Sequence, residues 1–154
     1  MAVHTASVVW DRAAGAAFID NRYSRAHRWE FDGGAIVAAS SSPAVVPVPL
    51  SDAAGVDPEE AFVASLSSCH MLWFLFFAAK AGFVVDSYRD AAAGHMEKTT
   101  DGSQWMARVV LRPEVRFAGA APDAATSAAM HDKAHHACFI ANSVKTTVTV
   151  EGME

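Results

Sequence analysis

The segment that most constrains this chain runs from Asp57 to Gly82 and carries the marks of one long apolar helix. Asp57 supplies an N-cap acceptor, Pro58 suits the first helical position, and Glu60 stands three residues after the cap in capping-box register. The pattern predicts a helix that ends near Lys80, where Gly82 terminates it. Because this helix is apolar nearly all round, we expect it to lie buried in the middle of the fold.

The same segment is long enough to span a bilayer, at residues 61–79. Polar side chains interrupt it at four positions, and charged residues stand at both ends. We therefore interpret it as a buried core helix and expect no membrane partner. The interrupting residues are Ser65, Ser67, Ser68 and His70, and the flanking charges are Glu59, Glu60 and Lys80.

Extended segments precede and follow this helix. A proline-rich stretch at residues 40–49 favours a surface loop, and Pro122 with Asp123 opens a second helix that reaches about Ala137. The order of strands, helix, strands, helix and strand predicts an α+β domain. The predicted strands cover residues 5–10, 28–31, 84–97, 104–117 and 144–150, and a further extended stretch is expected at residues 16–19.

Composition favours one compact domain over residues 1–154, since 52% of the residues are hydrophobic and 19% charged. The net charge of -5 argues against nonspecific nucleic-acid binding. The N-terminal residues do not resemble a secretory signal peptide, because they lack a basic region and an apolar core. We therefore expect a reducing, cytoplasmic location.

The chain contains two cysteines, Cys69 within the long apolar helix and Cys138 after a run of histidines. In a reducing compartment, two thiols suit a redox pair, one attacking and one resolving, better than a structural disulfide. The alternative is that Cys69 acts as a small hydrophobic core residue. Pairing requires α-carbons within about 7 Å, which the sequence leaves open.

A reactive thiol needs a cation or hydrogen-bond donors to lower its pKa. Arg22, Arg25 and Arg28 form the candidate cluster, and Glu59 could orient one of them through a bidentate pair. The alternative is that these arginines are solvated and that Glu59 serves only the helix dipole.

The histidines offer a metal-binding alternative. His131, His135 and Cys138 fall at positions i, i+4 and i+7, and Cys69 or His70 could complete a tetrahedral zinc site. The competing interpretation, which we favour, is that His131 and His135 lie on a solvated helix face. We therefore expect no metal and no other cofactor.

Two sequence blocks and one shorter match resemble the OsmC/Ohr family, the osmotically inducible and organic hydroperoxide resistance proteins. Residues 57–69, which begin D-P-E-E-A-F and end at Cys69, resemble the family's N-P-E-x-L-x-A-A-x-x-x-C helix and keep its ten-residue spacing from Glu59 to Cys69. Residues 134–145, A-H-H-A-C-F-I-A-N-S-V-K, resemble its A-H-x-x-C-P-x-S-N-S block. Residues 24–28 match the family's N-terminal arginine region.

This resemblance implies an OsmC-like fold, with antiparallel sheets around a long buried central helix, and a thiol peroxidase that acts in oxidative stress. Cys69 would attack an organic hydroperoxide and become a sulfenic acid, and Cys138 would resolve it to a disulfide. Arg25 would lower the thiolate pKa and bind the peroxide, while Glu59 would hold Arg25. A dithiol such as dihydrolipoamide would reduce the disulfide.

The resemblance also implies an intertwined homodimer, and helix geometry agrees. Glu59 and Cys69 are separated by about 15 Å along a helix axis, so one chain would struggle to place both around one peroxide. We expect Glu59 and Arg25 to act on the Cys69 of the second copy.

The chain departs from the family in three places. Phe139 replaces a proline, His70 follows the first cysteine, and the stretch between Gly33 and Gly55 is longer. These departures leave the substrate, the role of the longer stretch and the functional arginine open, with Arg28 and then Arg22 after Arg25.

Two other functions stay open from the sequence. One is a noncatalytic OsmC-like dimer that binds a small molecule or a metal. The other is a hydrolase that uses Cys69 and His70, although adjacent helix residues point about 100° apart and pose such a dyad poorly.

Overall fold

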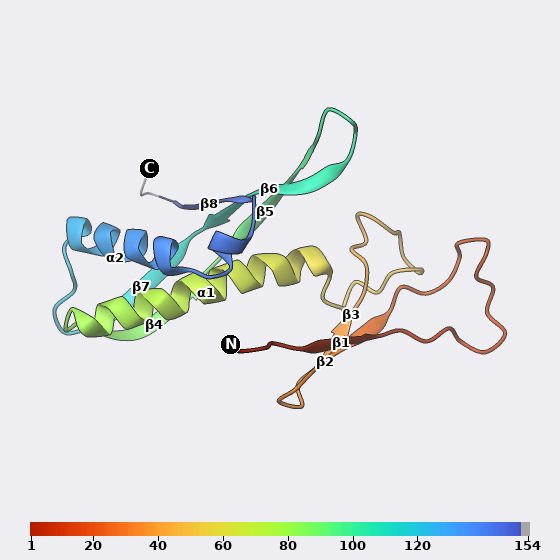
Figure 1. Ribbon diagram of the computed structural model, residues 1–154, viewed down its shortest axis with the longest axis horizontal. Coiled ribbons are helices and arrows are strands. Elements are labelled where there is room, and N and C mark those ends of the chain that lie inside the picture. The colour runs from red at the N-terminus through yellow and green to blue at the C-terminus, as the bar shows by residue number, and fades with distance from the viewer. Residues whose placement is uncertain (152–154) are drawn as a thin grey trace. The chain divides into compact units, whose positions relative to one another are not determined.

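The computed structural model describes residues 1–151, and the chain divides into two compact units, Met1–Ala61 and Phe62–Glu154. Within residues 1–151 the chain forms two α-helices, one short 3-10 helix and eight strands, which confirms the α+β class (Figure 1). The expectation of a single domain over residues 1–154 stays a prediction, and its last three residues lie outside the described part.

The first unit is built on a three-stranded antiparallel sheet in the order β1-β2-β3. The loop after β3 folds back on the sheet, because Ala39 bridges Val56 and the hydroxyl of the buried Ser40 accepts the N–H of Asp52 at 2.9 Å. The proline-rich stretch at residues 40–49 is a surface loop, as predicted, and is built of turns. The strands are β1 (Ala6–Val9), β2 (His27–Phe31) and β3 (Ile36–Ala39).

Helix α1 spans Pro58–Lys80, as its local signals predict. The Asp57 carboxylate accepts the N–H of Glu60 at 2.7 Å, and the Glu60 carboxylate accepts the N–H of Asp57 at 3.1 Å. At the other end, the N–H of Phe83 binds the carbonyl of Ala78, and Gly82 has a φ of 83°. The capping box and the glycine stop are both confirmed.

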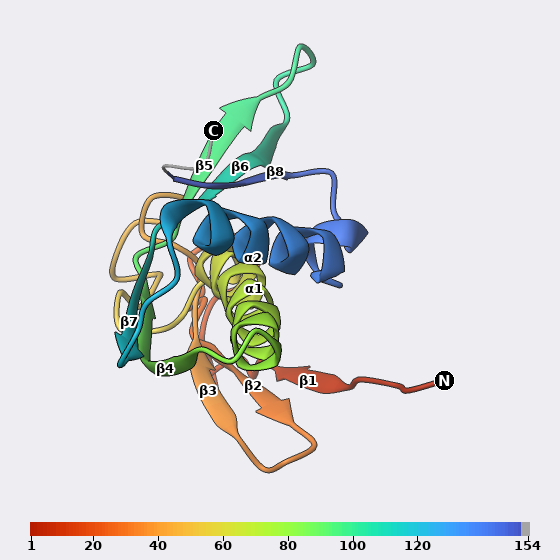
Figure 2. The same cartoon turned by 90° about the vertical axis from the view of Figure 1, so that its left-hand side faces the viewer.

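The second unit holds two small sheets and the second helix. β4 pairs with β7, while β5, β6 and β8 form a sheet in which β6 and β8 run parallel. The tip of the β5–β6 hairpin extends beyond β8 (Figure 2). The elements are β4 (Val84–Asp90), β5 (Ala93–Lys98), β6 (Gln104–Leu111), β7 (Pro113–Ala118), α2 (Ala124–Ala137), the short 3-10 helix η1 (Ala141–Ser143) and β8 (Thr147–Val150).

The two long strands predicted at residues 84–97 and 104–117 are each broken in two, so that prediction was wrong in its boundaries. The breaks coincide with Asp90, whose carboxylate accepts the N–H of Arg112 at 2.6 Å. Pro113 follows and starts β7, since proline has no N–H to donate. The Asp90 carboxylate thus binds the backbone N–H of Arg112, which would otherwise pair with a neighbouring strand.

Helix α1 buries one stripe of side chains at a spacing of four residues: Leu66, His70, Phe74 and Ala78. Its other face carries exposed apolar side chains, including Leu72 and Phe76. The helix therefore lies less buried within this chain than we expected. By length and hydropathy alone α1 could cross a membrane, a test that a core helix also passes.

The glycine at the end of α1 provides a test of this geometry. Gly82→Ala places a Cβ on a left-handed backbone and is expected to lower the free energy of unfolding by about 1–2 kcal/mol. Gly33→Ala is the matched control, because Gly33 has open space around it and no positive φ. Urea denaturation measures both, and equal stabilities for the two variants would contradict the assigned helix stop.

Candidate active site

Helices α1 and α2 bring the two cysteines together in the second unit. Helix α2 packs across α1: in Figure 2 α1 is seen nearly end-on while α2 runs across the view. Cys69 lies in the middle of α1, and Cys138 is the C-cap residue of α2. Both thiols are free, and the Cys69 thiol lies close enough to Cys138 to perturb its ionisation.

Cys138 is held at the junction between α2 and η1. Its Sγ accepts the N–H of Ala141 at 3.4 Å, and its carbonyl accepts the N–H of Asn142 at 3.0 Å. Burial, together with the adjacent Cys69 thiol, raises the pKa of Cys138 to about 11. The Ala141 N–H opposes this rise but is outweighed. Cys138 is therefore a protonated thiol at neutral pH.

The two cysteines differ in access to solvent. Cys138 is 1% exposed, whereas Cys69 is partly exposed. A thiol that meets a peroxide must be reachable and must form a thiolate, and Cys138 meets neither requirement in this state. Solutes can therefore reach the Cys69 thiol, whereas the neighbouring Cys138 thiol is enclosed.

A buried pair of histidines joins the two helices beside the thiols. His70 Nε2 and His131 Nδ1 are 3.0 Å apart, and the rings stack with an interplanar angle of 8°. His131 is 5% exposed, so the expectation that it lies on a solvated face was wrong. Phe74 covers it, with ring centroids 4.2 Å apart.

This pair was missed from the sequence, although one signal was available. His70 falls on the same four-residue stripe as Leu66 and Phe74, which marks a side chain that faces the neighbouring element. The structure also turns His70 toward His131, and within residues 1–151 it makes no hydrogen bond to Cys69. The hydrolase dyad of Cys69 and His70 is therefore not formed.

The metal-binding alternative finds no geometric support in the part of the chain that the structure describes. No three His, Cys, Asp or Glu side chains there are grouped so that they could hold an ion. His131 is engaged with His70 instead.

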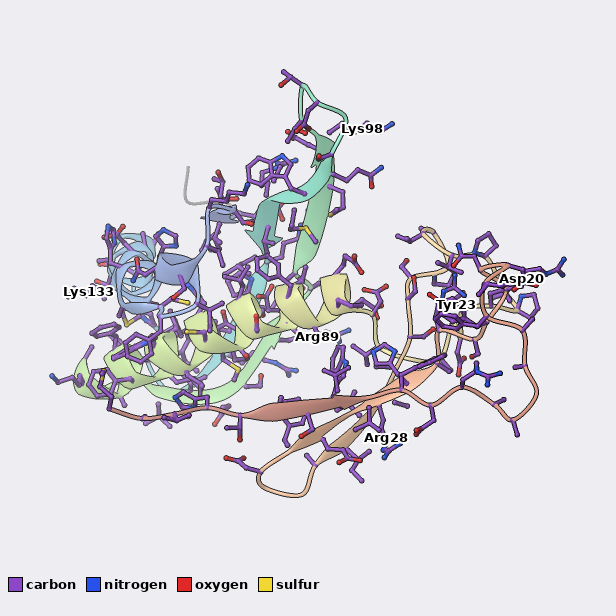
Figure 3. The ribbon with its side chains drawn as sticks, turned by 45° about the vertical axis from the view of Figure 1, so that its right-hand side comes forward. Asp20, Tyr23, Arg28, Arg89, Lys98 and Lys133 are labelled. Atoms are coloured by element: carbon purple, nitrogen blue, oxygen red, sulfur yellow. The ribbon has the colours of Figure 1, made fainter. Side chains whose placement is uncertain are left out.

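The predicted residues Arg25 and Glu59 line one cavity of about 470 Å³ in the first unit. Three aromatic rings form an apolar wall: the Phe18 and Tyr23 rings stack at 4.5 Å, and Trp10 meets Tyr23 edge-on at 5.5 Å. Figure 3 shows Tyr23 in the folded loop that follows β1. These three aromatic residues are spread along the sequence, and no sequence pattern predicted that their side chains would be in contact.

Arg25 is fixed by its own loop. Its guanidinium lies 3.7 Å from the centroid of the Tyr23 ring and donates to the carbonyl of Tyr23 and to the carbonyl and side-chain oxygens of Asn21. Two of its five N–H groups, on Nε and Nη1, keep no partner within residues 1–151. Glu59 lines the same cavity, but no ion pair joins it to Arg25 in the described residues.

The two other candidate arginines lie outside the lining of this cavity. Arg28 projects from β2 (Figure 3) and pairs with Glu30 at 2.6 Å and with Asp11 at 3.8 Å. Arg22 is exposed. The geometry thus favours Arg25, although its role stays a prediction.

The buried His70–His131 pair is expected to make the free energy of unfolding depend on pH. Burial lowers the pKa of His70, and also that of His131, to about 4. Unfolded histidine binds a proton near pH 6.5, so stability is complete above that pH and is lost as the pH falls toward 4. We expect the free energy of unfolding to fall by up to about 1.4 kcal/mol per pH unit for each imidazole.

Urea denaturation between pH 7 and 4.5 measures this slope. The double variant His70→Leu with His131→Leu should flatten it, whereas His136→Gln, at an exposed position, should leave it unchanged. An unchanged slope in the double variant would contradict the burial of two neutral imidazoles.

Comparison with known proteins agrees with this architecture. The family described as OsmC-like protein matches residues 51–152. An OsmC-like protein of unknown function from Vibrio cholerae is 56% identical, has a TM-score of 0.95, and is covered over 99% of its length by 98% of this chain. No curated protein sequence matches.

Two more distant structures share the fold. The organic hydroperoxide resistance protein OsmC of Legionella pneumophila has 15% identity, a TM-score of 0.61 and coverage of 97% of this chain and 98% of that one. An organic hydroperoxide resistance protein of Elizabethkingia anophelis has 16% identity, a TM-score of 0.64 and coverage of 97% and 96%. The two sequence blocks, the α+β fold and the match over residues 51–152 together place this chain in the OsmC-like family.

Proposed function

We propose that this protein is a thiol peroxidase that reduces organic hydroperoxides through a Cys69 sulfenic acid and a Cys69–Cys138 disulfide. The observation that carries the proposal is the pair of adjacent free thiols, one partly exposed and one buried with a raised pKa. Structural neighbours named as organic hydroperoxide resistance proteins support the substrate class.

The chemistry is balanced by the two thiols and the peroxide. The Cys69 thiolate attacks one peroxide oxygen, so an S–O bond forms, the O–O bond breaks, and the alkoxide takes a proton and leaves as an alcohol. The Cys138 sulfur then attacks the sulfenic acid sulfur, and its proton leaves with the hydroxyl group as water. A dithiol such as dihydrolipoamide returns both thiols by exchange, so no cofactor is needed.

Burial of Cys138 suits this second step. A thiol that is protonated and enclosed until its partner is oxidised avoids direct oxidation by solutes. Its position beside Cys69 gives it a high effective concentration for the sulfenic acid. The sulfenic acid is thereby captured before further oxidation, which is irreversible in most proteins.

The cavity in the first unit supplies the remaining parts of the proposed site. Its aromatic wall suits an apolar hydroperoxide, and the free N–H groups of Arg25 suit the developing alkoxide charge. We propose that it serves the Cys69 of a second copy in an intertwined homodimer. The apolar face of α1 that this chain leaves uncovered, which includes Leu72 and Phe76, supports such an association.

We also propose that the enzyme acts in a reducing, cytoplasmic compartment. There the disulfide is a transient intermediate, because cellular dithiols restore the two thiols.

The two cysteine roles are tested by serine variants. Cys69→Ser should abolish turnover of cumene hydroperoxide with dihydrolipoamide as reductant. Cys138→Ser should react once and accumulate a sulfenic acid that dimedone traps at Cys69, because no thiol is left to resolve it. A Cys138→Ser protein without a dimedone adduct at Cys69 would refute the assigned roles.

The arginine is tested against a matched neighbour. Arg25→Met should lower kcat/KM by about 10²–10³-fold, as expected when a donor to developing negative charge is removed. Arg28→Met should stay within about threefold, since Arg28 pairs with Glu30 and Asp11 outside the cavity lining.

Complementation then tests whether the site is shared between copies. Cys69→Ser and Arg25→Met chains, refolded together in equal amounts, should recover about a quarter of the wild-type activity, because half the dimers then hold one intact site of two. A mixture that stays inactive would contradict a site completed by the second copy.

A further inference from the structure

The hydrogen bond between His70 and His131 is a polar contact inside an otherwise apolar contact between helices. The surrounding core cluster consists of Phe74 and Ala78 from α1 and Met130 and Ala134 from α2. Apolar burial is nondirectional and specifies an axial position less sharply than a hydrogen bond between two single atoms does. The imidazole bond, at 3.0 Å, joins one atom of each helix and so defines a register.

The His70–His131 contact also lowers the stability of the fold, because it buries a polar atom that has no partner in the described part of the chain. His70 is 1% exposed, yet its Nδ1 has no partner within residues 1–151. A leucine at this position would fill the space without burying an unpaired polar atom. The groups that face the pair are Asp90, which acts electrostatically on His131, and His135, which acts on His70.

The same two helices carry the two thiols. Cys69 is adjacent to His70 in α1, and Cys138 follows His131 by seven residues, as the C-cap of α2. A slide of α1 by a single residue would displace Cys69 by about 1.5 Å along the axis. A disulfide tolerates α-carbon separations of only about 4.4–6.8 Å, so such a slide alters the ease of bond formation.

We infer that the His70–His131 hydrogen bond is a positioning contact that sets the register of α1 on α2 and thereby holds Cys69 and Cys138 where they can form a disulfide. His70 and His131 act through the cysteines and touch no reacting atom themselves. The inference rests on the proposed function in that the Cys69–Cys138 disulfide is a step of that cycle. A buried polar contact that specifies a register has a precedent in helical assemblies.

The test measures disulfide formation without any peroxide. Wild-type and variant proteins are equilibrated in reduced and oxidised dithiothreitol, and the fraction of Cys69–Cys138 disulfide is measured by mass spectrometry. His131→Leu fills the space but cannot bond, and should lower the equilibrium constant for the disulfide about three- to tenfold. Its midpoint in urea should also fall, because His70 is left buried without a partner. The double variant His70→Leu with His131→Leu buries no unpaired imidazole and should show the same loss in the disulfide equilibrium constant at nearly the wild-type midpoint.

Two further variants separate register from packing. His131→Asn places an amide near the position of Nδ1 and should restore most of the wild-type equilibrium constant. Met130→Leu, in the same core cluster, removes no hydrogen bond and should leave the equilibrium constant unchanged.

The outcomes are decisive and distinct from those of the peroxidase tests. A His131→Leu protein with the wild-type equilibrium constant, or a Met130→Leu protein with an equal loss, overturns the inference. If the wild type forms the disulfide and His131→Leu weakens it while hydroperoxide is not reduced, the positioning role stands and the proposed function fails. If hydroperoxide is reduced but His131→Leu has no effect on the equilibrium, only the positioning role fails.

Discussion

The contact of one stripe of α1 with α2 is the interaction on which the candidate site depends. Four residues at a spacing of four make this stripe, and Phe74 and Ala78 join Met130 and Ala134 in one core cluster. Because α2 crosses α1, the same contact that buries these side chains brings the middle of α1 near the end of α2. Two cysteines separated by 69 residues in sequence thus become neighbours.

From this contact follows a difference between two chemically identical side chains. The end of α2 encloses Cys138, whose sulfur accepts the N–H of Ala141, while the middle of α1 leaves Cys69 partly open. Burial disfavours the thiolate of Cys138. The surroundings of the two thiols therefore favour Cys69 as the attacking residue and Cys138 as the resolving one. The His70–His131 pair beside the thiols belongs to the same contact between α1 and α2.

Local signals predicted what local physics decides. The Asp57 and Glu60 capping box, the Gly82 stop and the Asp123 cap are satisfied within a few residues, so they could be read directly. The strand breaks could not, because Asp90 takes the N–H of a residue 22 positions away. Nor could the burial of His131, which α1 causes. For the site, motif resemblance led to Arg25 and Glu59, while the aromatic wall of their cavity depends on tertiary contacts.

The central claim is that Cys69 and Cys138 are the reacting pair. It is tested most directly by mass spectrometry of the wild-type cysteines before and after one equivalent of cumene hydroperoxide. The account predicts two free thiols before addition and a Cys69–Cys138 disulfide within one chain afterwards. Two thiols that remain free, or a disulfide between chains, would contradict it.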